Sequence, residues 1–362
     1  MSTQALINSV IRPEIRALTA YKVADATGFI KLDAMENPYI WPDALKTEWL
    51  KRVRDAEINR YPDPEAKSLC QILKAYNRIP DTCDLILGNG SDEIIQLLLM
   101  ALPAHAAVMA PEPSFVMYKQ IAQCLGLNYQ GLPLLADNFE LDIEAILGAI
   151  KAQQPAIIFL AYPNNPTGNL FDSAAIERII THSTGLVIID EAYAPFTDFS
   201  FIERLTEYNN LLVMRTVSKL GLAGLRLGFI AGHPSIINEL NKARLPYNIN
   251  TLTQCSAEFA LTHPEMFAEQ TGTICTERAR MFLQLSVLEG ISPSPSAANF
   301  ILFRTPHNRA TDIFNALKEK NILIKNLSSQ QSLLKDCLRV TIGKPEENNA
   351  FIKALKATLQ AL

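Results

Sequence analysis

The chain has 362 residues, of which 48% are hydrophobic and 19% charged, and this balance excludes a disordered or fibrous protein. It carries 33 Lys and Arg against 37 Asp and Glu, a formal net charge of −4. A surface that binds nucleic acid is therefore not expected, because phosphate neutralisation needs an excess of cations. The length predicts two domains or one large α/β unit.

The cysteines, histidines and apolar stretches further restrict the class of protein. The six cysteines include no CxxC pair and the five histidines are dispersed, so we expect free thiols and no metal site. The longest apolar stretch, residues 97–110, is shorter than the ~20 residues that span a bilayer. The first residues lack the basic region of a signal peptide. We therefore expect a cytoplasmic protein with no membrane partner.

Up to about residue 250, short apolar runs alternate with amphipathic segments. The runs are almost entirely hydrophobic, which is typical of parallel strands buried on both faces. They lie at 106–110, 156–161, 185–190, 211–215 and 227–231, and helical patterns lie at 114–125, 142–151 and 173–182. This alternation predicts an α/β fold with a mainly parallel central sheet flanked by helices.

The pattern changes after about residue 250. Two helical stretches follow each other, and then come shorter elements of mixed type. They are helices at 251–262 and 265–288, a strand at 299–304, a helix at 309–320, strands at 322–325 and 338–342, and a final helix from Pro345. We predict a large α/β domain over residues 45–285. A small α+β domain with an N-terminal arm is predicted from residues 1–44 together with 286–362.

Polar side chains stand where the predicted strands end. In an open parallel sheet, ligands bind beyond the carboxyl ends of the strands, so these side chains can converge on one crevice. They are Asn165 after the run 157–161, Asp190 after 186–189, Lys219 after 211–214, Ser91 and Asp92 after 85–90, and Arg226 before 227–231.

Together these groups fit the chemistry of pyridoxal phosphate. A lysine forms a Schiff base with its aldehyde, and a carboxylate keeps its pyridinium nitrogen protonated. A helix N-terminus, hydroxyls and an arginine can hold its phosphate. Taken singly, each residue has an ordinary alternative: Lys219 as a solvated lysine, Asp190 as a helix N-cap and Asn165 as a turn residue. A nicotinamide fingerprint is not supported, because Glu93 stands where the last glycine of GxGxxG would be.

The combination resembles the fold-type-I, pyridoxal-phosphate-dependent aminotransferases from about residue 32 to the C-terminus. Most of the shared motifs occur throughout that family. The run NRYPDP and the pairing of Lys325 with Arg339 are similar to those of the members that act on histidinol phosphate. The motifs are LDAMENPY (32–39), NRYPDP (59–64), GNGSDE (88–93), PEPSF (111–115), NNPTG (164–168), IDEAY (189–193), SKLGLAGLR (218–226) and CLRVTIG (337–343).

The resemblance implies a homodimer that transfers an amino group between histidinol phosphate and 2-oxoglutarate. The products would be imidazole-acetol phosphate and glutamate, in histidine biosynthesis. Lys219 would carry the cofactor and shuttle the proton, Asp190 would pair with the ring nitrogen, and Phe115 would stack on the ring. The other implied roles are Tyr193 and Asn165 on the ring hydroxyl; Ser91, Asp92, Thr216, Ser218, Arg226 and the partner's Tyr61 on the cofactor phosphate; and Arg339, Tyr21 and Lys325 on the substrate.

Two alternatives stay open, and a third is not supported. An aminotransferase for aromatic or other amino acids, and a phospho-amino-acid decarboxylase on the same scaffold, differ from this interpretation at the site for the substrate anion. A non-catalytic regulator of the same fold would need an appended DNA-binding module, and no segment of this sequence is free to form one.

Overall fold

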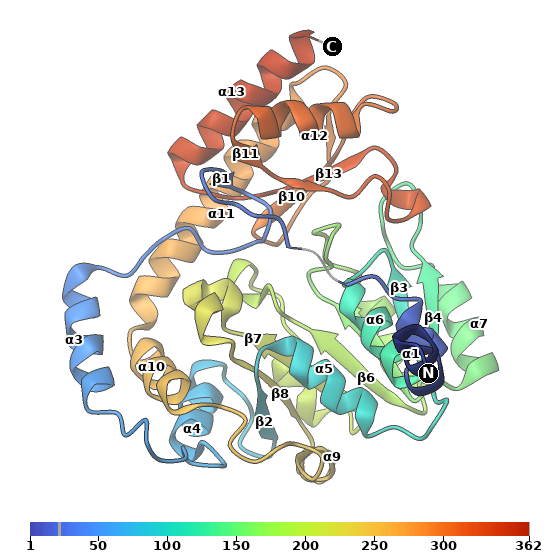
Figure 1. The fold of residues 1–362 in the computed structure, drawn as a ribbon, viewed down its shortest axis with the longest axis vertical. Coiled ribbons are helices and arrows are strands. Elements are labelled where there is room, and N and C mark those ends of the chain that lie inside the picture. Colours follow the sequence, from blue (N-terminus) through green and yellow to red (C-terminus); the bar gives the residue numbers. More distant parts are fainter. Residues whose placement is uncertain (21–22, 362) are drawn as a thin grey trace.

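A seven-stranded sheet forms the centre of the computed structural model, which describes residues 1–20 and 23–361. The strand order is β2-β8-β7-β6-β5-β3-β4. The five apolar runs of the sequence are all strands of this sheet (Figure 1). The strands are β2 (Asp84–Gly88), β3 (Ala107–Glu112), β4 (Asn128–Pro133), β5 (Ile157–Ala161), β6 (Leu186–Asp190), β7 (Leu211–Thr216) and β8 (Gly228–Gly232).

The sheet is parallel from β4 to β7, as predicted, but β8 runs antiparallel to both of its neighbours. A parallel connection needs a crossover of a dozen or more residues. Residues 217–227 form only two short helical turns, Ser218–Leu222 and Ala223–Leu225, so the chain returns directly beside β7. Lys219 and Arg226 therefore lie on one short reversing link at the carboxyl end of β7.

Helices cover both faces of this sheet. Alternate strand residues pack on opposite sides, so Val187 and Ile189 face one helical layer and Ile188 faces the other. One layer contains α4 (Lys67–Tyr76), α7 (Ile143–Gln153), α8 (Ser173–His182) and α10 (Thr251–Leu261). The other layer contains α5 (Ser91–Met100), α6 (Val116–Leu125) and α9 (Pro234–Asn241).

A second, smaller unit lies beside the carboxyl ends of the large sheet, and α11 (Pro264–Ser286) runs from one unit to the other (Figure 1). The sheet of this smaller unit has the order β12-β13-β10-β9, and all of its strand pairs are antiparallel. The strands are β9 (Ser292–Pro293), β10 (Phe300–Arg304), β12 (Lys325–Asn326) and β13 (Cys337–Thr341), and the helices are α12 (Ala310–Glu319) and α13 (Pro345–Ala361).

The single strand predicted at 322–325 is wrong, because the structure divides it between two sheets. β11 (Ile322–Leu323) pairs in parallel with β1 (Ile30–Lys31), whereas β12 pairs with β13. The β1–β11 pair attaches the segment after residue 31 to the small unit. Residues 33–37 consequently pass over the carboxyl ends of the large sheet, where they become part of the site described below.

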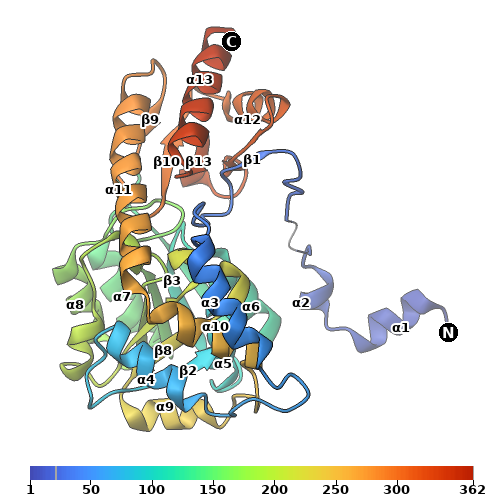
Figure 2. The same cartoon turned by 90° about the vertical axis from the view of Figure 1, so that its left-hand side faces the viewer.

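The N-terminal segment lies at the edge of the large unit. α1 (Thr3–Val10) and α2 (Pro13–Arg16) have no buried residue, but α2 contacts α6, and Arg12 donates a hydrogen bond to the carbonyl of Cys124. Figure 2 shows α1 pointing away from the body. α3 (Asp43–Arg54) then leads into the large unit. Three further short helices are Ala194–Phe196, Ile202–Thr206 and Ser332–Leu334. Within the described part of the chain, no helix is both long and apolar enough to span a bilayer.

Candidate active site

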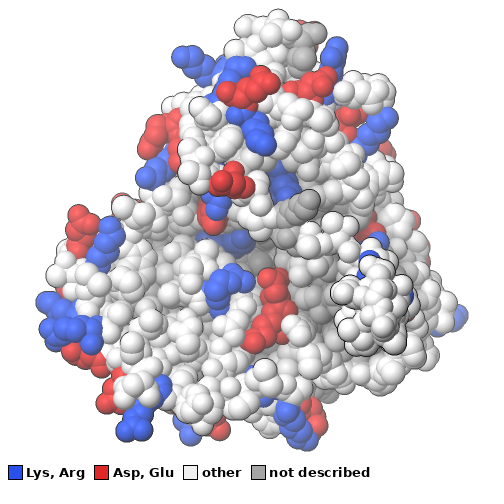
Figure 3. Space-filling model, in the orientation of Figure 1, with Lys and Arg blue, Asp and Glu red and all other residues white. Residues whose placement is uncertain are grey.

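A cavity of about 440 Å³ opens at the carboxyl ends of β5, β6 and β7. Its size lies within the range of small-molecule and cofactor sites. Figure 3 shows this face of the molecule hollowed between the two units, with basic and acidic side chains along the hollow. The cavity is lined by every predicted cofactor-binding residue except Tyr61, namely Ser91, Asp92, Phe115, Asn165, Asp190, Tyr193, Thr216, Ser218, Lys219 and Arg226.

Lys219 stands in the first helical turn after β7 and points its amino group into the cavity wall. Its Nζ donates to the carbonyl of Ala34 at 3.4 Å and lies 5.8 Å from the ring centroid of Tyr193. Burial of the amine and, next, the positive charge of Arg339 lower the pKa of Lys219 to about 8. About a tenth of this amine is therefore in the neutral, nucleophilic form at pH 7, far more than for an ordinary lysine.

Asp190 is the last residue of β6 and is buried. Its Oδ2 accepts a hydrogen bond from the hydroxyl of Tyr118 at 2.5 Å, and its Oδ1 accepts one from the backbone N–H of Ala192 at 3.1 Å. Burial raises the pKa of Asp190 to about 6, and these two hydrogen bonds oppose that rise. A carboxylate held in this way suits a cationic N–H group of a ligand.

The adjacent carboxylate, Glu191, has a different environment. It faces the opposite helical layer, where its Oε2 accepts from Nη2 of Arg215 at 2.7 Å and from Oγ of Ser200 at 2.9 Å. The negative charge of Glu191 is thus balanced by Arg215 inside the protein. Asp190 is the carboxylate of this pair that is presented to the cavity.

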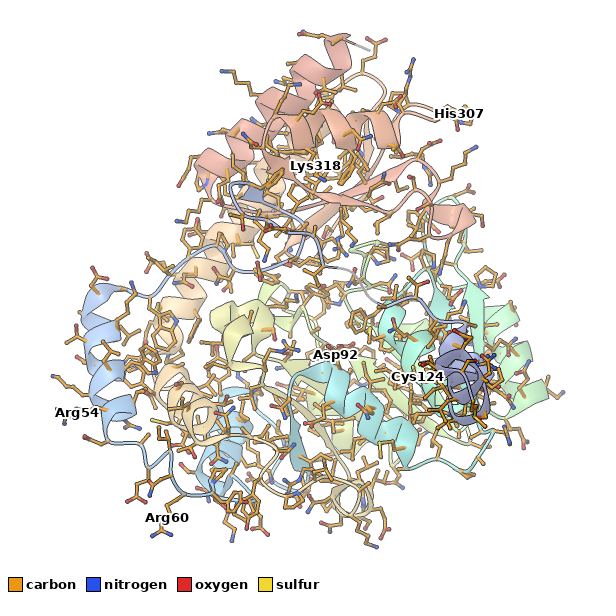
Figure 4. The ribbon with its side chains drawn as sticks, in the orientation of Figure 1. Arg54, Arg60, Asp92, Cys124, His307 and Lys318 are labelled. Carbon is orange, nitrogen blue, oxygen red and sulfur yellow. The ribbon has the colours of Figure 1, made fainter. Side chains whose placement is uncertain are left out.

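The turn before α5 has the form of an anion site. Gly90 has a φ of +79°, and a Cβ there would lie 2.7 Å from Nη2 of Arg226. A Cβ at Gly228 would lie 2.9 Å from the carbonyl carbon of Gly90. Only glycine fits this close packing, which turns the first N–H groups of α5 toward the cavity. Figure 4 shows Asp92 at this end of α5, near the middle of the molecule.

Side chains complete the same end of the cavity. The hydroxyl of Thr216 donates to Oγ of Ser218 at 2.8 Å and accepts from the N–H of Ser218 at 3.1 Å. Arg226 lies 3.6 Å from Oδ2 of Asp92. Oδ1 of Asp92 is buried without a hydrogen-bond partner among the described residues, and burial raises the pKa of this carboxyl. Unused N–H groups, hydroxyls and a guanidinium fit a phosphate group here.

Arg339 approaches the cavity from the small unit. It stands in β13, and its Nη1 donates to Oδ1 of Asn165 at 2.6 Å while its Nη2 donates to the carbonyl of Asp33 at 3.0 Å. The guanidinium carbon lies 5.2 Å from the ring centroid of Phe300. Lys325 is the cross-strand partner of Arg339 in the β12–β13 register, so the two predicted anion-binding residues are neighbours.

Among the described residues, Tyr61, Lys325 and Arg339 are predicted site residues that do not line the cavity itself. Tyr61 is 81% exposed and stacks on Tyr247, with 4.5 Å between their ring centroids. Its role in a partner's site therefore stays a prediction. Tyr21 lies outside the described residues. In the part of the chain that is described, no group of three or more His, Cys, Asp and Glu side chains could hold a metal ion.

Sequence reasoning missed two residues of the site. Tyr118 looks like an ordinary core aromatic in a helix, and its spacing of one turn from Phe115 was the available signal. Glu36 lines the cavity and pairs with Lys31 at 2.6 Å. It is brought there by the β1–β11 pairing, and two-residue strands leave no periodic pattern to read.

Comparisons with known proteins agree with this geometry. The family model described as aminotransferase class I and II matches residues 27–355. Histidinol-phosphate aminotransferase 2 of Nitrosococcus oceani is 57% identical over 348 residues, which cover 96% of each chain. Histidinol-phosphate aminotransferase 1 of Ralstonia nicotianae is 49% identical, covering 99% of this chain and 97% of that protein.

Solved structures show the same fold. The histidinol-phosphate aminotransferase from Sinorhizobium meliloti, in complex with pyridoxal-5'-phosphate, has a TM-score of 0.87 at 22% identity and covers 98% of each chain. The L-threonine-O-3-phosphate decarboxylase from Porphyromonas gingivalis has a TM-score of 0.76 at 24% identity, covering 91% of this chain and 99% of that one. Given the family model and relatives that match nearly its whole length, this chain belongs to the class I and II aminotransferases.

Proposed function

We propose that this protein is a pyridoxal-phosphate-dependent histidinol-phosphate aminotransferase. It exchanges an amino group between histidinol phosphate and 2-oxoglutarate, with imidazole-acetol phosphate and glutamate as products, in histidine biosynthesis. The observation that carries the proposal is one cavity lined by Lys219 and Asp190, with Arg339 bonded to its wall at Asn165. Relatives with 46–57% identity over nearly the whole chain bear this enzyme's name.

The residues present fit the cofactor, which when bound supplies an aldehyde for the amino group and a ring that accepts electrons. Lys219 would hold the cofactor through Nζ, and its free amine would carry a proton from the substrate carbon to the cofactor. The carboxylate of Asp190 would keep the ring nitrogen protonated. Phe115 would stack on the ring, and Tyr193 and Asn165 would bind its hydroxyl.

The phosphate of the cofactor has a separate set of ligands. The N–H groups at the start of α5 would donate hydrogen bonds to its oxygens, and the side chains around them would orient it. These ligands are Ser91, Asp92, Thr216, Ser218 and Arg226. Because β8 and the turn before α5 pack without room for a Cβ, a side chain at either glycine would displace the N–H groups that would bind the phosphate.

The substrates share one anion site. Arg339 binds the phosphate of histidinol phosphate in one half-reaction and a carboxylate of glutamate in the other, because its planar fork bonds either anion in a bidentate way. Lys325 adds a second positive charge, which favours the more highly charged phosphate. Tyr21 assists at the same site.

The enzyme works as a homodimer in the cytoplasm, where its six cysteines stay reduced. The exposed Tyr61 supports a dimer in which this residue completes the partner's phosphate site. Mixed subunits test this arrangement. When Tyr61→Phe chains exchange with Lys219→Ala chains, a contact in trans puts both lesions in one site and leaves the other intact, so activity returns. No recovery, with exchange confirmed, rules the contact out.

Single-turnover spectroscopy of the cofactor tests the function itself. Histidinol phosphate and glutamate are expected to convert the bound cofactor faster than phenylalanine or tyrosine does. A preference for phenylalanine over histidinol phosphate would establish an aromatic aminotransferase instead. Release of CO₂ from a phospho-amino acid would establish the decarboxylase, whose fold this chain shares.

A further inference from the structure

The contact between Tyr118 and Asp190 joins a helix to the end of a strand inside the protein. Tyr118 is fully buried and Asp190 nearly so. The O–H···O distance of 2.5 Å is the length expected when a neutral hydroxyl donates to an ionised carboxylate. Burial, and then the charge of Asp190, raise the pKa of Tyr118 far above its usual value, so this phenol keeps its proton and always acts as the donor.

The position of the phenol is fixed by its neighbours. Its ring stacks on Phe159 with 4.5 Å between centroids and an angle of 6° between planes. It meets Phe115, a cavity residue, edge-on at 5.5 Å. The alternation along β6 turns Asp190 toward the layer that contains α6. The hydroxyl is therefore aimed at the carboxylate before any ligand binds.

Most features of the environment of Asp190 oppose its ionisation. Burial is the largest effect, and the negative charges of Asp92 on α5 and of Glu191 in its own chain add to it. Two groups favour the ionised form, namely the hydroxyl of Tyr118 from α6 and the backbone N–H of Ala192. The phenol of Tyr193 is also close enough for its pKa to respond to Asp190.

We infer that Tyr118 is a positioning residue, whose hydroxyl holds Asp190 in the ionised state and in the orientation that the cofactor's ring nitrogen requires. Without this donor, Asp190 keeps only the N–H of Ala192 among the two groups that favour its charge. It would then be protonated at a higher pH and free to rotate. The inference deepens the proposed function and rests on it for the identity of the ring nitrogen.

Titration of the Asp190 carboxyl carbon by ¹³C NMR tests the inference on the full-length chain without cofactor. Asp190→Asn identifies the resonance. Tyr118→Phe removes one oxygen and is expected to raise the pKa of Asp190 by about one unit, as loss of a hydrogen bond to a charged group does. Tyr129→Phe is the matched control, because this phenol is hydrogen-bonded to another carboxylate, Glu112. It is expected to leave the titration of Asp190 unchanged.

The cofactor-loaded protein gives a second measurement. The affinity for pyridoxal phosphate is expected to fall as the pH is lowered. In Tyr118→Phe this fall should occur about one pH unit higher than in the wild type or in Tyr129→Phe. An unchanged carboxyl titration in Tyr118→Phe, or an equal shift in both variants, overturns the inference. A wild type that binds no pyridoxal phosphate overturns the proposed function alone, since the carboxyl titration needs no cofactor.

A labelled chain replaces Tyr118→Phe if that variant does not fold. Incorporation of 3-fluorotyrosine keeps the ring and makes the phenol a stronger donor. It is expected to lower the pKa of Asp190. A carboxyl that titrates as in the unlabelled chain would show that the hydroxyl of Tyr118 has no influence on Asp190.

Discussion

The two sides of the cavity are built in different ways. The side that faces the large sheet consists of strand ends and the turns directly after them, and its polar residues Asp190, Thr216 and Ser218 are buried. The opposite side is formed by residues 34–36 after β1, and Arg339 of β13, far away in the sequence, bonds to the cavity wall at Asn165. The residues proposed to hold the cofactor thus sit mainly on one continuous sheet and its turns, whereas those proposed to bind the substrate anion belong to a separate unit.

Replacing Lys219 tests the sheet side most severely. Lys219→Ala is expected to lower kcat/KM by at least 10³-fold, because the variant has no amine to hold the cofactor or to move the proton. Borohydride reduction and peptide mapping of the wild type should find the cofactor on this residue. Lys74→Ala is the control, since Lys74 pairs with Asp84 outside the cavity. Label on any other lysine would contradict the assignment.

Asp190→Asn tests the charge on the same side without altering its shape. We expect the variant to bind the cofactor but to turn over at least 10²-fold more slowly, a rise of about 3 kcal/mol in the barrier. The effect should appear in kcat measured with either substrate. Normal turnover of the cofactor-loaded variant would show that Asp190 does not pair with the ring nitrogen.

Arg339→Ala tests the small-unit side. Loss of the bidentate donor is expected to weaken both substrates by about 2–3 kcal/mol, roughly 30- to 160-fold in kcat/KM. Arg304→Ala is a matched control on the neighbouring strand, because that guanidinium binds the carbonyls of Leu333 and Lys335 instead. If the loss is confined to one substrate, the two anions do not share this site.

The pH dependence of cofactor binding sharpens the description of the sheet side. The pKa of Lys219 is lowered to about 8, so its amine is mostly protonated at pH 7 and mostly neutral at pH 9. The rate at which the cofactor-free chain attaches pyridoxal phosphate should therefore rise about tenfold between these values and level off above them. A rate that continues to climb toward pH 10.5 would indicate an ordinary lysine.

Lys325→Ala is expected to have the smallest effect and to separate the two substrates. The variant should lose about fivefold in kcat/KM for histidinol phosphate and less for glutamate, since phosphate carries the higher charge. Lys320→Ala, an exposed lysine just after α12, is the control. Equal losses for both substrates would favour an aminotransferase of broader specificity.

The sequence predicted the sheet side better than the side formed by the small unit. Asp190, Asn165 and Lys219 were identifiable because each follows a buried apolar run, and the ends of parallel strands meet at one edge. The direction of β8 was not predictable, because an apolar run has the same composition in either direction. The edge strand β4 was missed because it is half exposed and mixed in composition.

The residues on the small-unit side of the cavity could not be identified from strand ends alone. Arg339 and Lys325 were assigned through family resemblance, and their pairing depends on the register between β12 and β13. Glu36 was missed because tertiary pairing, rather than a local pattern, brings it to the cavity. Tyr118 was missed because its spacing from Phe115 shows only that the two share a helix face, and not that its hydroxyl faces a carboxylate.

The short link between β7 and β8 affects how the site tolerates changes in chain length. Lys219 and Arg226 stand at opposite ends of this link, and β7 and β8 are hydrogen-bonded to each other on either side of it. The residue proposed to anchor the cofactor covalently and the one proposed to anchor its phosphate are consequently carried on one short link. Insertions elsewhere in the large unit leave their separation unchanged, whereas a single residue added within 220–225 would alter the spacing between the two anchors directly.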